Sequence, residues 1–196
     1  MNNSFEKNKY TIKRNFFSFF WWKFKILDEE ENLLFYSEMK AFKLKEDIKI
    51  FSDETMVQEL LRIKARSIID FSATYDVFDS LEDKKIGSFK RKWLKSIFKD
   101  EWIFLDINDN EVWLIKEDST GLALLRRWTW LLWNILFPQK YIWTINEQKV
   151  CLFKQNSNPF VHKINLDYSD DIENILDRRL WLAAWILLCA IEGKQK

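Results

Sequence analysis

The apolar run near the C-terminus is the feature that most limits how this chain can fold. Residues 180–191 read LWLAAWILLCAI, which is apolar on every face of a helix. A helix of this kind lies in a protein core or spans a membrane. At about 1.5 Å per residue the run covers roughly 18 Å, well short of the ~30 Å hydrocarbon core of a bilayer. We therefore predict a core helix that the rest of the chain surrounds.

The residues on either side of this run predict where the helix begins and ends. Asp170, Asp171 and Glu173 precede it, and acidic side chains favour the first turn of a helix, where the backbone dipole is positive. Glu192 and Gly193 follow it. The sequence therefore predicts a C-terminal core helix over about residues 171–192.

The part of the chain from Tyr10 to Lys116 has the pattern of strands. Short apolar or alternating runs are separated there by charged turns. The chain has only 3 Gly and 2 Pro among 196 residues. Turns must therefore be built mainly from Asp, Asn, Ser and Glu, as in the segments 28–32 and 108–110. We interpret nearly all of this half as a β-meander.

A weak internal repeat supports this interpretation. Residues 24–28 (FKILD) match residues 75–79 (YDVFD), and residues 47–53 match residues 100–106. Two units of about four strands, with a third set near residues 141–166, give about twelve strands, enough for a closed β-barrel. A barrel this wide needs something to fill its lumen. The predicted fold is mainly β: a closed barrel around a central hydrophobic C-terminal helix, in a single domain over residues 1–196.

One additional helix is predicted over residues 120–137. Apolar residues recur there at three- and four-residue spacing, and Pro138 follows the run. Trp128, Trp130 and Trp133 would fall on different faces of such a helix, so at least one should lie away from the core. A strand over part of this run is the alternative.

Three segments, residues 75–79, 85–92 and 96–103, together with the apolar C-terminal helix, resemble the scramblase-like branch of the tubby C-terminal superfamily, which includes the plant LURP-one-related proteins. The resemblance runs from about Tyr10 to Ile191 and rests on strand and turn patterns. It implies a twelve-stranded barrel around a central helix. Superfamily members are associated with phosphoinositide binding or membrane lipid redistribution. The sequence matches neither a tubby-type phosphoinositide site nor the cysteine-rich segment of scramblases, so neither activity is carried over to particular residues.

Composition excludes some partners and indicates a location. The formal net charge is +1, with 31 basic and 30 acidic residues, so the chain lacks the broad positive field of non-specific nucleic-acid binding. Nucleic acid is not an expected partner. Cys151 and Cys189 are expected to be buried thiols, which suits a reducing cytoplasm. No secretory signal is evident, so we expect a cytoplasmic protein, with peripheral membrane association as a further hypothesis.

The sequence gives little support for catalysis. His162 is the single histidine and no nucleophile signature accompanies it, so a strand-surface or core histidine is favoured. Residues 106–117 imitate a calcium loop, but Glu111 stands where the loop needs Gly, which favours a plain hairpin turn. The three glycines lie far apart, so no phosphate-binding loop is present. We predict no enzyme activity, no catalytic residue, no metal and no cofactor.

The candidate lipid-binding residues are basic side chains that lie beside tryptophan in the sequence. Cations can contact lipid phosphates while an indole ring lies at the level of the headgroups. The candidates are Lys85, Lys90, Arg91, Lys92, Trp93, Arg126 and Arg127. The aromatic stretches 16–22 and 128–133 form a second possible membrane-facing set. An ordinary solvated strand face, or packing under the barrel rim, is the alternative.

The sequence therefore predicts a non-enzymatic β-barrel that binds an anionic membrane surface or a partner protein. Two alternatives stay open. One is a small-molecule carrier with a pocket between barrel and helix. The other is a lipid scramblase-like protein, which would require the helix to leave the barrel. The identity of the lipid, ligand or partner and the oligomeric state are not indicated by the sequence.

Overall fold

The computed structural model describes residues 3–14, 21–40, 47–69, 72–93, 100–116, 140–145, 148–155, 162–172, 175 and 177–192. These residues form a short 3-10 helix, twelve strands and one α-helix. The elements are η1 (Asn3–Glu6), β1 (Lys9–Arg14), β2 (Trp21–Leu27), β3 (Leu33–Lys40), β4 (Ile48–Phe51), β5 (Glu59–Ile69), β6 (Ser72–Asp79), β7 (Lys84–Trp93), β8 (Asp100–Leu105), β9 (Glu111–Lys116), β10 (Lys140–Ile145), β11 (Gln148–Gln155), β12 (His162–Asp167) and α3 (Arg178–Glu192). The additional helix predicted over residues 120–137 lies outside the described residues.

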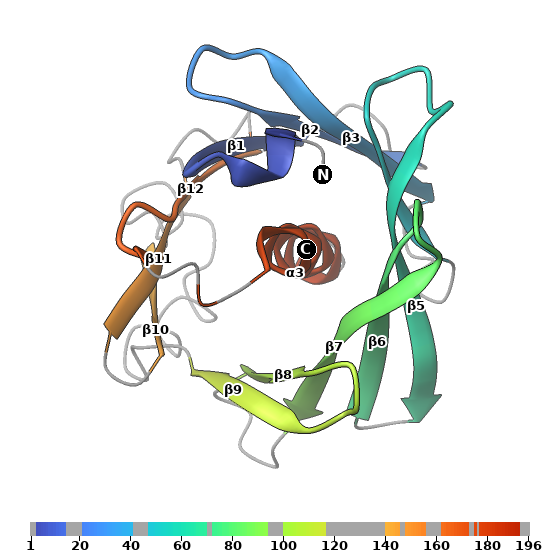
Figure 1. The fold of residues 1–196 in the computed structure, drawn as a ribbon, viewed down its shortest axis with the longest axis vertical. Helices are drawn as coiled ribbons and strands as arrows, with labels where there is room; N and C mark the ends of the chain where they lie inside the picture. Colours follow the sequence, from blue (N-terminus) through green and yellow to red (C-terminus); the bar gives the residue numbers. More distant parts are fainter. Residues whose placement is uncertain are drawn as a thin grey trace, which may run out of the picture.

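All twelve strands belong to one sheet with the order β10-β11-β12-β1-β2-β3-β4-β5-β6-β7-β8-β9. Each strand is antiparallel to its neighbours, and the join between β12 and β1 pairs Asp167 with Lys9. The sheet curls around α3, and its edge strands β9 and β10 lie next to each other (Figure 1). No ladder joins these two edges within the described residues. The prediction of a mainly β fold around a C-terminal helix is thus confirmed.

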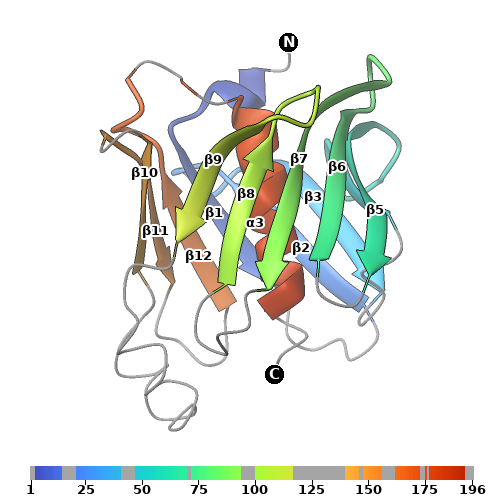
Figure 2. The ribbon, with the colours of Figure 1, turned by 90° about the horizontal axis from the view of Figure 1, so that it is seen from below.

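The core lies between the inner face of the sheet and α3. In β2 the burial alternates, with Trp22, Phe24 and Ile26 buried, as the pleat of a strand requires. Helix α3 runs along the middle of the curled sheet (Figure 2), and both of its tryptophans, Trp181 and Trp185, are buried. A helix that is apolar on every face is stable here because the curled sheet packs around it.

Helix α3 begins at Arg178, later than the predicted start near residue 171. Asp177 provides the N-cap, because its carboxylate accepts a hydrogen bond from the Arg179 N–H at 2.9 Å. Asp171 lies instead in a turn, where its N–H donates to the Tyr168 carbonyl oxygen at 3.0 Å. Its carboxylate accepts from the Ile175 N–H at 3.0 Å. The acidic run that suggested a helix start is thus used in the preceding turn, because Asp side chains stabilise both.

Aspartates build the hairpin turns, as the scarcity of glycine predicts. In each of four turns the carboxylate of an Asp accepts the backbone N–H two residues further on. The pairs are Asp28 with Glu30, Asp53 with Thr55, Asp79 with Leu81, and Asp106 with Asn108, at 3.0, 2.8, 2.9 and 2.8 Å. Each turn also places one residue other than Gly at positive φ, namely Glu31, Met56, Asp83 and Asp109. The segment that imitates a calcium loop is therefore a hairpin turn, as favoured from the sequence.

The internal repeat corresponds to a repeated structure. In the four hairpins β2–β3, β4–β5, β6–β7 and β8–β9 the register shifts by one residue beside the turn. The extra residue always belongs to the strand that follows the turn, and these residues are Leu34, Leu60, Ile86 and Val112. A bulge next to each turn increases the twist of the hairpin, which helps the sheet to curl.

Candidate functional site

The antiparallel order of the strands gives the curled sheet two different rims. The "turn rim" is formed by the hairpin turns 28–32, 52–58, 80–83 and 106–110, together with the described residues between β12 and α3. The "strand-end rim" lies opposite and is formed by the last residues of the odd-numbered strands and the first residues of the even-numbered strands. Helix α3 begins at the turn rim and runs towards the strand-end rim (Figure 2).

The predicted lipid-binding residues of β7 are divided between these rims. Lys85 lies at the start of β7, at the turn rim, whereas Lys90, Arg91, Lys92 and Trp93 lie at its end, at the strand-end rim. Lys90 is half-buried and pairs with Thr74 of β6 and Ile103 of β8. Arg91, Lys92 and Trp93 are described by their backbone positions at the end of β7. Arg126 and Arg127 lie outside the described residues.

Lys85 belongs to an ionic network on the outer face of the sheet. Its ammonium nitrogen lies 2.6 Å from Asp109 Oδ1 and 3.6 Å from Asp76 Oδ1. The Arg66 guanidinium bridges the same two aspartates, with Nε 2.8 Å from Asp76 Oδ2 and Nη1 2.9 Å from Asp109 Oδ2. The Ser88 hydroxyl donates to Asp76 Oδ1 at 2.7 Å. Lys85 is thus engaged within the protein and apart from the other candidates.

This network changes the pKa of its acidic groups. Hydrogen bonds from Arg66 and Lys85 hold the pKa of Asp109 well below its usual range. The pKa of Asp76 is also lowered: burial opposes ionisation of this carboxyl, but the hydrogen bonds from Arg66 and Ser88 outweigh it. Both carboxylates therefore remain charged at neutral pH. The arrangement fastens the turn of β8–β9 to β5, β6 and β7.

Two pairs of a cation and an indole ring lie at the strand-end rim. The Lys40 ammonium at the end of β3 lies 5.6 Å from the ring centre of Trp21 at the start of β2. The Arg14 guanidinium at the end of β1 lies 4.4 Å from the ring centre of Trp22. Such distances permit cation–π attraction. Cation and indole are thus combined at three neighbouring strands.

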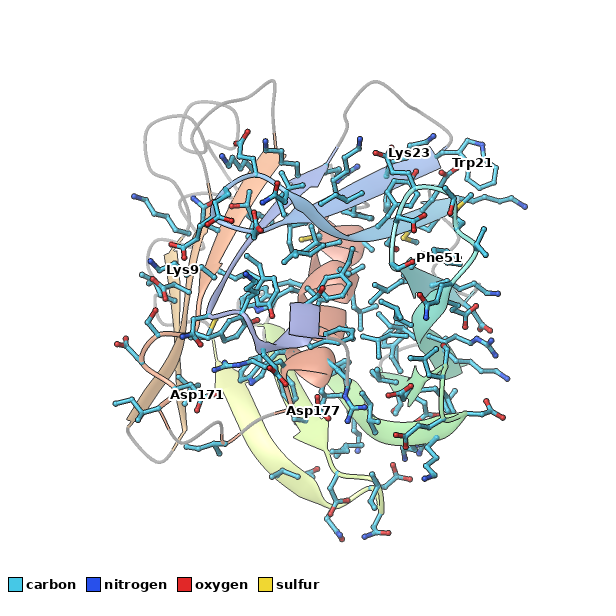
Figure 3. The ribbon with its side chains drawn as sticks, turned by 45° about the horizontal axis from the view of Figure 1, so that its top comes forward. Lys9, Trp21, Lys23, Phe51, Asp171 and Asp177 are labelled. Carbon is cyan, nitrogen blue, oxygen red and sulfur yellow. The ribbon has the colours of Figure 1, made fainter. Side chains whose placement is uncertain are left out.

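The two tryptophans differ in exposure. Trp22 is buried, whereas Trp21 is 41% exposed and points outwards, on the same side as Lys23 (Figure 3). The aromatic stretch 16–22 is therefore divided at this point, and residues 16–20 lie outside the described part, as do residues 128–133. An exposed tryptophan beside a lysine is the combination found at membrane interfaces.

Arg14 is an inward-facing residue that the sequence did not single out. It alternates with the buried Tyr10 and Ile12 on β1, so it shares the inner face of the sheet. Burial lowers the pKa of Arg14, and an electrostatic interaction with Cys189, near the end of α3, acts in the opposite direction. A cation at this place complements the negative C-terminal end of the helix dipole. Arg14 thus connects the strand-end rim with the end of α3.

The start of α3 is fixed by ion pairs at the turn rim. Arg178 Nη1 lies 3.1 Å from the buried carboxylate of Asp171, and the Arg178 guanidinium lies 4.6 Å from the ring centre of Tyr168. Arg179 bridges its neighbour Asp177 and Asp79 at the end of β6. These contacts hold the first turn of the helix against β6 and the segment after β12. The positions of Asp171 and Asp177 are visible in Figure 3.

The remaining reactive groups of the described part are two cysteines and one histidine. Cys151 and Cys189 are buried free thiols, as predicted, and burial raises the pKa of Cys151. His162 is the first residue of β12. No group of three metal-ligating side chains is found among the described residues. No helix in the described part of the chain is long and apolar enough to cross a membrane.

The protein is thus a curled antiparallel sheet with a helix inside it. Basic and aromatic residues lie together at one of its rims. Comparison with known proteins does not extend this description. No family model matches the sequence, and no curated protein matches it either.

Proposed function

We propose that this chain is a non-catalytic β-barrel that binds an anionic lipid surface through its strand-end rim. The observation that carries the proposal is the exposed Trp21 beside Lys40, next to the Arg14–Trp22 pair. Lys90, Arg91 and Lys92 at the end of β7 add positive charge to the same rim. Association would be peripheral, from the cytoplasm.

Elementary energetics supports this function. A basic residue close to an anionic membrane contributes about 1 kcal/mol of attraction, and the attraction falls within a Debye length of the surface. An indole ring prefers the headgroup region, because its body is apolar while its N–H is polar. Several cations with one exposed tryptophan are therefore enough for reversible binding. Neither kind of residue alone would give comparable affinity.

The experiment is co-sedimentation with vesicles of phosphatidylcholine alone, or with added phosphatidylserine, at low and high salt. We expect binding to the anionic vesicles only, and loss of that binding at high salt. The variant Lys90→Gln, Arg91→Gln, Lys92→Gln should bind at least about tenfold more weakly, because three cations contribute up to about 3 kcal/mol. Trp21→Ala should weaken binding separately.

The matched control removes three cations from or beside the turn rim: Lys7→Gln, Lys9→Gln, Lys84→Gln. It has the same net charge as the triple variant of β7 but keeps the strand-end rim intact. If both triple variants lose affinity equally, binding depends on net charge alone and the proposed site is wrong. Absence of binding to every vesicle would favour a protein partner instead.

The proposed barrel would be closed, as in the tubby-like and scramblase-like proteins that the sequence resembles. The curl of the sheet and the nearness of β9 and β10 support closure (Figure 1). Closure would satisfy the backbone groups of both edge strands, which an open sheet leaves to solvent. Hydrogen–deuterium exchange provides the test. Amides of β9 and β10 should exchange as slowly as those of β2; rapid exchange of the alternate amides that point away from β8 and β11 would indicate an open sheet.

A further inference from the structure

The nearly neutral net charge of this chain conceals a separation of charge between the two rims. The turn-rim segments 28–32, 52–58, 80–83, 106–110 and 168–172, with Asp177, contain aspartate and glutamate but no lysine or arginine. These segments are far apart in sequence, and the sheet order brings them to one rim. Cations lie on or beside the adjoining ends of β1, β7 and α3, and they are fewer than these carboxylates: Lys7, Lys9, Lys84, Lys85, Arg178 and Arg179. The hairpin chemistry explains part of this bias, because Asp builds the turns.

The strand-end rim has the opposite bias. Its strand ends carry Arg14, Lys40, Arg91, Lys92, Lys116 and Lys140. Counted along the sequence, 17 residues within three positions of the strand ends at this rim are lysine or arginine, and eight are aspartate or glutamate. The charge thus changes sign from one end of the curled sheet to the other.

Helix α3 gives the distance over which this change takes place. Its 15 residues correspond to roughly 22 Å at about 1.5 Å per residue. This exceeds the Debye length of about 8 Å at physiological ionic strength, so a surface that touches one rim barely senses the other. The helix dipole has its positive end at the acidic rim and its negative end at the basic rim, so the rim charges complement it.

We infer that this charge separation fixes the orientation of the protein on an anionic membrane, with the axis of α3 upright, the strand-end rim on the lipid and the turn rim in solvent. The inference rests on the proposed lipid binding and goes beyond it. Cations at the strand-end rim attract the surface, while the carboxylates of the turn rim are repelled from it. The exposed Trp21 then lies at headgroup depth.

Site-specific fluorescence can test the orientation. One variant, Lys23→Cys, carries a fluorophore near the strand-end rim, and another, Glu82→Cys, carries it at the turn rim. Both native cysteines are buried, so unmodified protein should take up little dye. Vesicles of phosphatidylcholine and phosphatidylserine contain a lipid with a nitroxide headgroup as quencher. We expect the label at position 23 to be quenched several-fold more strongly than the label at position 82.

A charge variant tests the cause. With Glu29→Lys, Glu30→Lys and Glu54→Lys added, the label at position 82 should be quenched as strongly as the label at position 23. Equal quenching of the two labels before this change would overturn the inference, and so would a position-82 signal that the added lysines leave unaltered. Sedimentation of the same labelled samples separates the two proposals. Protein that sediments with vesicles but shows equal quenching contradicts the orientation alone, whereas protein that does not sediment contradicts the lipid binding.

Discussion

Gly87 allows β7 and α3 to approach each other closely. A Cβ at this position would lie 2.9 Å from Leu180 Cδ2 and 3.0 Å from the Leu105 carbonyl oxygen. The first neighbour belongs to a flexible side chain, but the second belongs to the backbone of β8, which the ladder holds in place. No larger side chain therefore fits without displacing the sheet or the helix.

We predict that Gly87→Ala lowers the free energy of unfolding by roughly 1–3 kcal/mol, the usual range for one methyl group too many in a packed core. Urea denaturation followed by circular dichroism measures this loss. In a Leu180→Ala background the same substitution should cost less, because its nearest neighbour has been removed. It should still cost something, because the Leu105 oxygen remains. Equal costs in both backgrounds would show that Leu180 does not restrict this site.

For single residues, the sequence predicts local turn chemistry well, but it predicts poorly which side chains meet across strands. The excess of Asp and Asn over Gly predicted how the turns are built, because that chemistry is local. The pairs Arg14–Trp22 and Lys40–Trp21 were not predicted, because each joins residues on different strands. Lys85 was likewise grouped with Lys90 because the two are close in sequence. In the structure they lie towards opposite ends of β7 and therefore near opposite rims.

Helix α3 depends on a cap that lies outside its apolar run. Asp177 accepts the Arg179 N–H and also pairs with the Arg179 guanidinium, which in turn contacts Asp79 of β6. Asp177 thus stabilises the first turn of α3. It also orients Arg179, which attaches this turn to the sheet. The apolar run made the helix predictable, but its start was not, because acidic residues occur both before and at the true cap.

We predict that Asp177→Ala lowers the free energy of unfolding by about 1 kcal/mol, the typical cost of losing an N-cap. Asp177→Asn should cost less, because an amide oxygen can still accept the Arg179 N–H. Thermal unfolding of the two variants beside the parent chain measures the difference. Equal losses would mean that the ion pair with Arg179, rather than the cap, carries the stabilisation.

For the whole molecule, the fold follows from two complementary surfaces, a helix that is apolar all round and a sheet with one apolar face. The continuous apolar run and the alternation of the strands are both visible in the sequence, which explains why the mainly β fold with a core helix could be predicted. The pairing of β1 with β12, which joins β10–β12 to the rest of the sheet, could not be predicted, because it links residues far apart in the chain. That pairing decides where the ends of β10, β11 and β12 lie relative to those of the other strands.

The hairpin turns 28–32 and 106–110 each contain a carboxylate that forms ion pairs with residues on two other strands. Glu31 lies 3.0 Å from the Lys13 ammonium on β1 and 3.5 Å from that of Lys163 on β12. Asp109 contacts Lys85 on β7 and Arg66 on β5 in the same way. Each turn therefore reaches back over the preceding strands and fastens them together. The pKa of both carboxyls is lowered, mainly by hydrogen bonds from these partners, Lys13 for Glu31 and Arg66 for Asp109.

The lowered pKa values predict how stability depends on pH. A carboxyl whose pKa is lower in the folded chain binds fewer protons there than in the unfolded chain, so its contribution is complete above the unfolded pKa of about 4 and declines below it. The double variant Glu31→Gln, Asp109→Asn should therefore be less stable than the parent at pH 7. The difference in urea midpoint should shrink progressively as the pH falls below about 4. A difference that stays constant down to pH 3 would show that these carboxylates act through packing or turn geometry rather than through their charge.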